Sequence, residues 1–430
     1  MSVPTSLPAD SHFVKSPEGI PSAKSVTDTV AGILADIELD GEAAVRSWSE
    51  KLDGWNPDSF RVSQQTVDAA IAGLDPALRA QLDFALDNIR TFATYQLNAI
   101  QPVEVELQPG VHLGHRLVPI ESVGAYIPGG RYPLIASAFM GVATAKIAGV
   151  PRVVAVAPPQ PGGEGIHPVQ LAAIALAGAD EIYAIGGVQA LGAIAHGVGE
   201  LGRPVDFVVG AGNSYVTEAK RQLFGVVGID SLAGPSELAI VADDTADPAI
   251  VAADLLGQAE HGPTSEVILV TTSDNLAQQV LIELDEQLKV LPTAETAAEA
   301  WRAAGALIVA GSKESAAQIT NEIATEHLEL QTIDNEWYFE HVTTYGTVFV
   351  GTEATVAFSD KAVGTNHVLP TGRAARYTGG LWAGTFLRVL THQRTTIEGS
   401  QATARATVAI SEAEGMVGHA ETARRRLATT

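Results

Sequence analysis

The sequence predicts an α/β protein with two lobes, each built around a parallel sheet, and with helical segments at both ends of the chain. One observation is size: 430 residues correspond to two or three domains at about 150 residues each. Another is the hydrophobic content of 46%, which is enough for packed cores and excludes disorder as the dominant state. The third is an alternation of short β-branched runs with Ala-rich helical stretches, which is typical of parallel sheets covered by helices.

The N-terminal part of the chain is predicted to be helical. Apolar residues recur at helical spacing in 26–39, 42–52 and 65–72. Pro76 follows Asp75 at a position that suits the first turn of another helix, which runs towards Gln101. We assign residues 1–115 to a helical N-terminal region that forms part of the first lobe.

The middle of the chain carries the predicted strands, with helices between them. The strand candidates are 153–157, 182–185, 206–209, 238–241, 267–270, 306–309 and 347–350. They are too many for one comfortable sheet, so we expect two Rossmann-like lobes. Residues 116–236 would form the second lobe, and residues 237–377 would continue the first and carry its metal and catalytic residues. Ligands of such folds bind beyond the carboxyl ends of the strands, where we expect the site.

The C-terminal segment, the net charge and the absence of Cys limit the partners, bonds and location that we expect for the protein. Residues 378–430 read as Arg-, Glu- and Ala-rich helices, an arm that packs on a partner or another lobe. The 26 Lys and Arg against 50 Asp and Glu give a net charge of −24, which disfavours nucleic acid and anionic membranes. The absence of Cys excludes disulfides and Cys-based zinc sites. No signal peptide or smooth apolar span is evident, so we expect a cytoplasmic protein.

Two segments could supply metal ligands or proton carriers. Gln258 and His261 lie three residues apart near the end of a predicted helix, so they could converge on one ion. The alternative is a polar helix end capped by Gly262. Glu326 and His327 are adjacent and could carry protons near neutral pH, although a solvated pair is the commoner case.

Two more segments contain candidate residues, one around Asp360 and the other in the C-terminal tail. Asp360 and His367 lie in a segment punctuated by Gly and Pro, and loops often carry sites, but an Asx-type turn at Asn366 explains the composition equally well. His419 in the tail could equally be a surface residue. Nitrogen and oxygen donors without sulfur suit zinc in an open, catalytic site, and such a set is offered by Gln258, His261, Asp360 and His419.

Glycine turns after predicted strands could bind a nucleotide. Gly210-Ala-Gly212-Asn213 precedes a helix, whose start could accept a phosphate. The third Gly of the dinucleotide fingerprint is missing, so the fingerprint itself fails. Tyr126 precedes a second glycine turn, and Gln189 follows a third. An ordinary strand-to-helix turn is the alternative for each.

Several segments occur in one order along nearly the whole chain. They are Tyr126-Ile-Pro-Gly-Gly, Gly186-Gly-Val-Gln189-Ala, Ala233-Gly-Pro-Ser236-Glu, Gln258-Ala-Glu-His261-Gly, Glu326-His327-Leu, Asn366-His-Val-Leu-Pro-Thr and Glu412-Ala-Glu-Gly-Met-Val-Gly-His419. With these segments the sequence resembles the histidinol dehydrogenase family. The resemblance implies a homodimer, one zinc ion per subunit, NAD, and oxidation of a primary alcohol to a carboxylate in two hydride transfers.

The resemblance also implies a role for each matching residue. The implied zinc ligands are Gln258, His261, Asp360 and His419, and the implied acid–base pair is Glu326 and His327. The implied NAD contacts are Tyr126, Gln189 and Asn213, and the implied substrate contacts are Ser236, His367 and Glu414. In the family the tail reaches the partner's site, so by analogy His419 and Glu414 would serve the other subunit.

The substrate side departs from the members that oxidise histidinol. Ala211 stands where they usually carry Pro, and the stretch after Arg131 lacks their Pro-Ser-Ser. These features look closer to the branch that includes sulfopropanediol 3-dehydrogenase. The expected substrate is therefore L-histidinol or a diol like 2,3-dihydroxypropane-1-sulfonate, with Arg131, Arg373 and Arg376 as candidates for an anionic end, or else as surface residues. The alternative function is a two-lobed small-molecule binding protein without catalysis.

Overall fold

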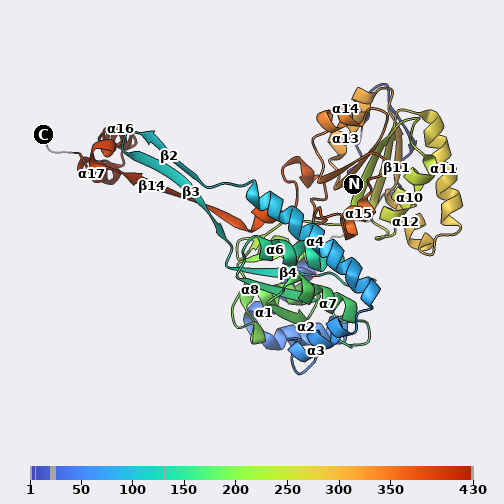
Figure 1. The fold of residues 1–430 in the computed structure, drawn as a ribbon, viewed down its shortest axis with the longest axis horizontal. Coiled ribbons are helices and arrows are strands. Elements are labelled where there is room, and N and C mark those ends of the chain that lie inside the picture. The colour runs from blue at the N-terminus through green and yellow to red at the C-terminus, as the bar shows by residue number, and fades with distance from the viewer. Residues whose placement is uncertain (1, 5, 20–25, 130–131, 428–430) are drawn as a thin grey trace.

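The computed structural model describes residues 2–4, 6–19, 26–129 and 132–427, so Arg131 lies outside the described residues. The chain forms two α/β lobes that lie side by side, and a narrow arm extends away from them (Figure 1). The predicted α/β class with parallel sheets is confirmed. Within the described residues, no helix is both long and apolar enough to cross a membrane.

One lobe contains a five-stranded sheet in the order β6-β5-β4-β7-β8. Its strands are β4 (Ser122–Tyr126), β5 (Arg152–Ala157), β6 (Glu181–Ala184), β7 (Phe207–Val209) and β8 (Gly228–Ile229), and all neighbouring pairs are parallel. The strand order reverses between β4 and β7, and ligands of open α/β sheets bind at such a switch point.

The N-terminal helices pack on this five-stranded lobe. α1 (Val26–Asp40) and α2 (Glu42–Asp53) lie against α8 (Gly187–His196), and α1 also lies against α9 (Ser214–Leu223). α3 (Gln64–Ala72) packs on α7 (Pro168–Ala177). We expected residues 1–115 to belong with residues 237–377, whereas only the short strand β1 (His12–Lys15) joins that other sheet. Amphipathic spacing predicts which face of a helix is buried, but not which sheet covers it.

The other lobe contains a six-stranded sheet in the order β1-β11-β10-β9-β12-β13. β9 (Glu237–Ala242), β10 (Glu266–Thr271), β11 (Ala306–Val309), β12 (His327–Gln331) and β13 (Thr347–Val350) are parallel, and β1 is antiparallel to β11. α10 (Pro248–Ala259), α11 (Asp274–Leu288) and α12 (Ala294–Ala304) cover one face. α13 (Lys313–Ile323) and α14 (Asn335–His341) cover the other. Both faces are buried, and β9, β10 and β11 are mainly apolar, whereas the equally buried β12 alternates apolar and polar residues and was not predicted.

The arm is built from two distant segments of the chain. β2 (Val103–Gln108), β3 (Val111–Pro119) and β14 (Leu387–Thr395) form an antiparallel sheet, and α16 (Ile397–Ala413) and α17 (Val417–Arg424) pack together beyond it (Figure 1). The expectation of a purely helical arm from residue 378 is corrected by this sheet. Every residue of β2 is exposed, so the strand lacks the buried face that most strands show.

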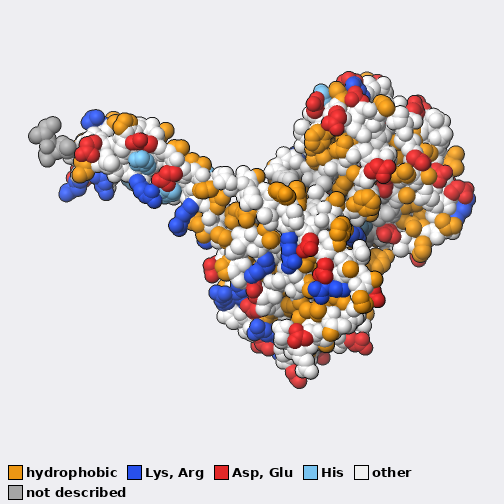
Figure 2. Space-filling model, in the orientation of Figure 1, with side chains coloured by type: hydrophobic (Ala, Val, Ile, Leu, Met, Phe, Trp, Pro, Cys, Tyr) orange, Lys and Arg blue, Asp and Glu red, His pale blue; other side chains and the backbone are white. Residues whose placement is uncertain are grey.

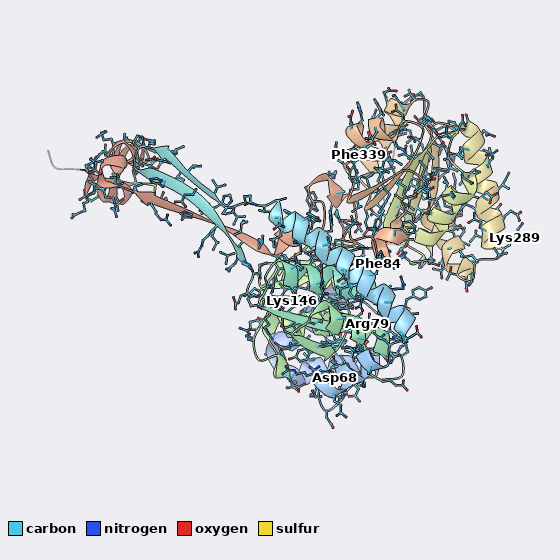
Figure 3. The ribbon with its side chains drawn as sticks, viewed as in Figure 1. Asp68, Arg79, Phe84, Lys146, Lys289 and Phe339 are labelled. Atoms are coloured by element: carbon cyan, nitrogen blue, oxygen red, sulfur yellow. The ribbon has the colours of Figure 1, made fainter. Side chains whose placement is uncertain are left out.

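α4 (Pro76–Asn98) runs along both lobes, with Arg79 and Phe84 labelled on it in Figure 3. Its buried residues Leu86 and Ile89 belong to the core of the five-stranded lobe. Asn88 Nδ2 donates to the carbonyl oxygen of Ala362, at 2.9 Å, in the segment that follows α15 (Val356–Lys361) of the other lobe. α4 therefore holds the two lobes together beside the functional segments described below.

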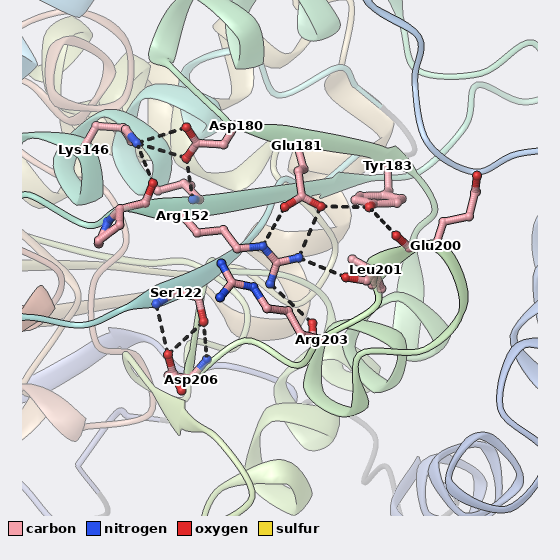
Figure 4. Close-up of polar contacts among 12 residues, drawn as sticks. Ser122, Lys146, Arg152, Asp180, Glu181, Tyr183, Glu200, Leu201, Arg203 and Asp206 are labelled. Atoms are coloured by element: carbon pink, nitrogen blue, oxygen red, sulfur yellow. Dashed lines mark hydrogen bonds and ion pairs between the residues drawn. The ribbon is translucent and has the colours of Figure 1, made fainter.

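A polar network closes the amino ends of the five-stranded sheet (Figure 4). Arg152, at the start of β5, donates from Nε to Glu181 Oε1, at the start of β6, at 2.6 Å. Lys146 and Asp180 form a second ion pair on this side at 3.0 Å. These contacts fix the starts of β5 and β6 relative to each other.

Candidate active site

Glu326 and His327 lie at the amino end of β12, in the interior of the six-stranded sheet. Although we expected sites beyond the carboxyl ends of strands, the structure places this candidate pair at the opposite end. The cause is the short connection before β12. α13 ends at Ile323, Ala324 takes a left-handed conformation with a φ of 51°, and the chain then enters the strand directly. Both side chains are consequently buried.

A row of hydrogen bonds connects Glu326 to α10. Ser236 Oγ and the backbone N–H of Glu237 donate to Glu326 Oε2, at 2.6 and 2.9 Å. Gln258 Nε2 donates in turn to Ser236 Oγ. His327 Nε2 lies 3.6 Å from Glu326 Oε2. Four residues predicted from scattered motifs, Gln258, Ser236, Glu326 and His327, are thus neighbours.

Burial separates the proton affinities of the pair. It raises the pKa of Glu326 well above the ordinary value, the nearby carboxylates of Glu237 and Asp360 raise it further, and the bond from Ser236 opposes the shift. Burial lowers the pKa of His327 to about 4. Burial therefore favours the protonated form of Glu326 and the neutral form of His327, a pairing suited to an acid beside a base.

Asp360 brings two histidines to this site. We expected Asp360 to lie in a loop, but it lies on the short helix α15. His261 Nε2 is 3.7 Å from Asp360 Oδ2, and His367 Nδ1 is 3.1 Å from the Asp360 carbonyl oxygen. Burial lowers the pKa of both His261 and His367, which favours the neutral imidazole, the form in which His261 would bind a metal ion. Burial would raise the pKa of Asp360, but the charges of His367, His327 and Lys361 outweigh it and lower that pKa.

The donors gathered here fit zinc, and His419 lies apart from them. His261 Nε2 and Asp360 Oδ2 have a separation that two ligands of one ion can have, because Zn–N and Zn–O bonds are about 2.0–2.2 Å. The Gln258 amide donates through nitrogen to Ser236, which leaves its oxygen as the remaining donor atom. His419 is exposed on α17, at the far end of the arm (Figure 1). In the part of the chain that is described, no cluster of three or more His, Asp or Glu residues could hold a metal ion.

The predicted nucleotide contacts gather at the carboxyl end of the five-stranded sheet. Tyr126 is the last residue of β4, and its hydroxyl accepts from the backbone N–H of Gly187 at 3.3 Å. Burial raises the pKa of Tyr126 to about 12, so the phenol stays neutral. Gln189 is fully buried and donates to Asp53 Oδ2 at 2.7 Å. Asn213 caps α9 by accepting from two backbone N–H groups.

The turn after β7 approaches β4 closely, as a nucleotide-binding turn requires. Gly210 has a φ of 122°, and a Cβ atom there would lie 2.2 Å from the carbonyl oxygen of Tyr126. Only glycine fits this position. The missing fingerprint glycine therefore does not prevent a tight turn at the switch point between β4 and β7.

Contacts between the lobes at this site could not be predicted from the sequence. Ser137 Oγ, from the five-stranded lobe, is 3.1 Å from His367 Nε2. Asn366 Nδ2 donates at 3.0 Å to the carbonyl oxygen of Met140, which lies in a π-helical turn (Phe139–Ala143). Such turns are frequent at functional sites, but neither Ser137 nor Met140 stands out in an Ala-rich stretch. Glu414, the other predicted substrate contact, is exposed on the arm like His419.

Comparison with known proteins gives consistent results. The model of the histidinol dehydrogenase family matches residues 18–427. A histidinol dehydrogenase homolog of Shouchella clausii is 48% identical over 394 residues, 92% of each chain. A sulfopropanediol 3-dehydrogenase of Ruegeria pomeroyi is 44% identical over 408 residues, 94% of this chain and 93% of that one. The crystal structure of histidinol dehydrogenase from Elizabethkingia anophelis superposes with a TM-score of 0.90 at 35% identity, covering 95% of this chain and 94% of that one.

Proposed function

The chain belongs to the histidinol dehydrogenase family and is a dehydrogenase, and we propose that it oxidises a polar primary alcohol through an aldehyde to a carboxylate, with NAD and zinc. The observation that carries the proposal is the buried carboxyl group of Glu326 beside the buried imidazole of His327, next to three nitrogen and oxygen donors. The alternative of a binding protein without catalysis loses its support, because the relatives that the chain resembles along its length are named as dehydrogenases.

His327 is proposed to take the proton of the substrate hydroxyl in the first oxidation. Its ring is neutral because burial lowers its pKa to about 4, so a proton-accepting nitrogen is present at neutral pH. Its Nδ1 is buried without a hydrogen-bond partner within the described residues. A buried polar atom of this kind is available to an incoming ligand.

Glu326 is proposed to activate water for the second oxidation. It can accept a proton from water only in its carboxylate form, which burial disfavours. The bonds from Ser236 and from the N–H of Glu237 stabilise the carboxylate once it forms. Ser236 therefore supports the charged state that the second step needs.

The cofactors are assigned from the donor chemistry. Gln258, His261 and Asp360 would hold zinc, which when bound would orient the alcohol and polarise its oxygen. Tyr126, Gln189 and Asn213 would hold NAD, which when bound would accept the hydride. The short Gly210 turn lets the backbone come close to a phosphate at the start of α9.

We also propose a homodimer in which the arm of one subunit completes the site of the other. The arm exposes apolar side chains along β2 and β14, among them Val105, Leu107 and Val389. Segments 103–119 and 387–427 carry seven Arg and six Asp or Glu, whereas the whole chain has 26 Lys and Arg against 50 Asp and Glu. Basic side chains, all of them Arg in these two segments, are visible along the arm in Figure 2. A near-neutral arm with exposed apolar groups suits docking on an acidic body, where it would deliver His419 and Glu414.

The substrate is proposed to be either L-histidinol or a diol of the 2,3-dihydroxypropane-1-sulfonate type. The identity to the sulfopropanediol 3-dehydrogenase, 44%, exceeds the 39% to the histidinol dehydrogenase of Methanosarcina mazei and the 40% to that of Trichormus variabilis, which supports the second. Arg373 and Arg376 are exposed on the segment that follows His367, where either could meet an anionic group. Arg376 Nε donates at 3.0 Å to the backbone carbonyl oxygen of Arg373, which fixes the side chain of Arg376 on this segment.

The test is NADH formation by the zinc-loaded protein with the two alcohols side by side. Activity on the sulfonate alone would support the divergent branch, and activity on histidinol would contradict it. Two NADH per alcohol consumed is the expected stoichiometry, and one would refute the second oxidation. If the zinc-bound protein oxidises neither alcohol, other polar primary alcohols should be assayed, and the NADH formed per alcohol consumed should be counted in the same way.

A further inference from the structure

Two buried carboxyl groups that the proposed chemistry does not use lie inside the six-stranded lobe. Glu329, on β12, is fully buried, and Asp254, on α10, is partly buried, and their side chains are hydrogen-bonded to each other. Gln331 Nε2 donates to both, at 3.0 Å to Asp254 Oδ2 and 3.1 Å to Glu329 Oε2. Two adjoining carboxyl groups cannot both ionise without strong repulsion, so they share one proton.

The pair also receives hydrogen bonds from the start of α15. Thr355 Oγ1 donates to Asp254 Oδ1 at 3.0 Å, and the backbone N–H of Val356 donates to Glu329 Oε1 at 3.0 Å. Three elements therefore meet at this pair: α10, β12 and α15. An Ala at either carboxyl position would leave buried donors of the other elements unpaired.

The same three elements carry the candidate site. On α10, Gln258 follows Asp254 by four residues and so shares its face. On β12, His327 precedes Glu329 by two residues and so points to the same side of the sheet. On α15, Asp360 follows the bonded N–H of Val356 by about one turn. If α10, β12 or α15 shifted where it contacts Asp254 or Glu329, a candidate metal ligand or the candidate base would therefore move with it.

The surroundings of Glu329 show what its charge would do. Ile240 of β9 and Phe349 of β13 lie beside it in the sheet, α15 turns a backbone N–H towards it, and α10 contributes Asp254. Burial, followed by the charge of Asp254, raises the pKa of Glu329 to about 8. Below that pH the pair holds its proton and bridges the elements, and above it two carboxylates repel each other.

We propose that Asp254 and Glu329 are positioning residues of the zinc site, and that their shared proton holds α10, β12 and α15 in the arrangement that binds the ion. The inference rests on the zinc site of the proposed function. It predicts that zinc affinity falls at alkaline pH. Protonation of ligands gives the opposite trend, since it weakens metal binding as the pH falls.

The test measures the zinc dissociation constant of the full-length protein between about pH 6.5 and about pH 9.5, by competition with a chromophoric chelator. The wild type is expected to bind zinc about 10- to 100-fold more weakly above pH 8 than at pH 7, the range that perturbed supporting contacts produce. Glu329→Gln cannot ionise and keeps the size of the side chain, so its affinity should stay constant over this range. Glu340→Gln, on the exposed face of α14, is the matched control and should follow the wild type.

Each outcome supports or overturns the positioning role. A parallel loss of affinity in the wild type and Glu329→Gln, or a flat profile in the wild type, would overturn it. Asp254→Asn should reproduce the flat profile of Glu329→Gln and keeps the inference testable if the first variant does not fold. A wild-type protein that binds no zinc at any pH would overturn the proposed metal site, and this inference with it.

Discussion

Replacing Lys220 with Met would leave a buried carboxylate without its counter-ion. Lys220 on α9 and Asp230 after β8 form an ion pair in which both side chains are 1% exposed. Lys220 Nζ also donates to the carbonyl oxygen of Gly210 at 2.9 Å, and Asp230 Oδ2 accepts from the N–H of Gly210 at 2.8 Å. The pair therefore holds both backbone groups of the turn that approaches β4.

Breaking a buried pair at one partner costs about 3–5 kcal/mol, because the remaining charge stays desolvated. We expect Lys220→Met to lower the free energy of unfolding of the five-stranded lobe by that amount. Denaturation followed by tryptophan fluorescence and circular dichroism would measure it. The neighbouring Arg221→Met is the matched control, because Arg221 is half exposed in its pair with Glu218 and surface pairs contribute little.

The double replacement Lys220→Met with Asp230→Leu separates charge from packing. It should recover most of the lost stability, since apolar replacement of both partners removes the unpaired charge. A loss with Lys220→Met no larger than with Arg221→Met would refute the reasoning. Gly210 loses side-chain hydrogen bonds in Lys220→Met and in the double variant. Both of these variants should therefore also raise the KM for the proposed cofactor NAD while leaving the zinc content unchanged.

Three further predictions concern the site and its assembly. His327→Asn should lower kcat by about two to four orders of magnitude if it removes a general base, with zinc retained, whereas His261→Asn should lose zinc first; kinetics and metal analysis of both variants would check this. Burial, followed by the charge of Glu266, raises the pKa of Glu237 to about 7, so the wild type should lose about 3 kcal/mol of stability as the pH rises from 4.5 to 7. In denaturation at several pH values, Glu237→Gln should remove this dependence of the unfolding free energy on pH. If the dependence were unchanged in the variant, groups other than Glu237 would cause it. A shared site predicts that mixing inactive His419→Asn and His327→Asn subunits restores activity, because one site of each mixed dimer keeps both histidines; no recovery after subunit exchange would place His419 in its own subunit's site.

The covered strand β12 was not predicted, because His327-Leu-Glu-Leu-Gln331 alternates apolar and polar residues. Most of the strands that were predicted are buried by helices on both faces. Val267–Val270 and Ala306–Val309 are examples, because a short, continuous apolar run rich in β-branched residues is typical of a strand in a covered parallel sheet. The strands of the arm were missed, although Val103-Glu-Val-Glu-Leu107 alternates apolar and polar residues as a strand does. An alternating run predicts one buried face, and in the single chain this strand has none.

The site was predictable as a set of residues but not as an arrangement. Motif order identified Gln258, Ser236 and Glu326, and the structure joins them through hydrogen bonds. The side chains that support them, such as Glu329 and Ser137, can be recognised only from contacts between elements that are distant in sequence. Spacing within a segment carries no information about such contacts.

The parallel strands of the two sheets follow the same order, but the sheets present opposite ends to the site. In the five-stranded sheet Tyr126 and Gly210 lie at the carboxyl ends, while in the six-stranded sheet Glu326 and His327 precede or begin a strand. The segment after α15 connects them, because Asn366 binds a carbonyl oxygen of one lobe and His367 binds the backbone of Asp360 in the other. Glycine turns and helix starts suit phosphate binding, and they occur at carboxyl ends. The buried acid and base of this chain lie instead at a strand start that enters the core at once, where desolvation shifts their pKa values.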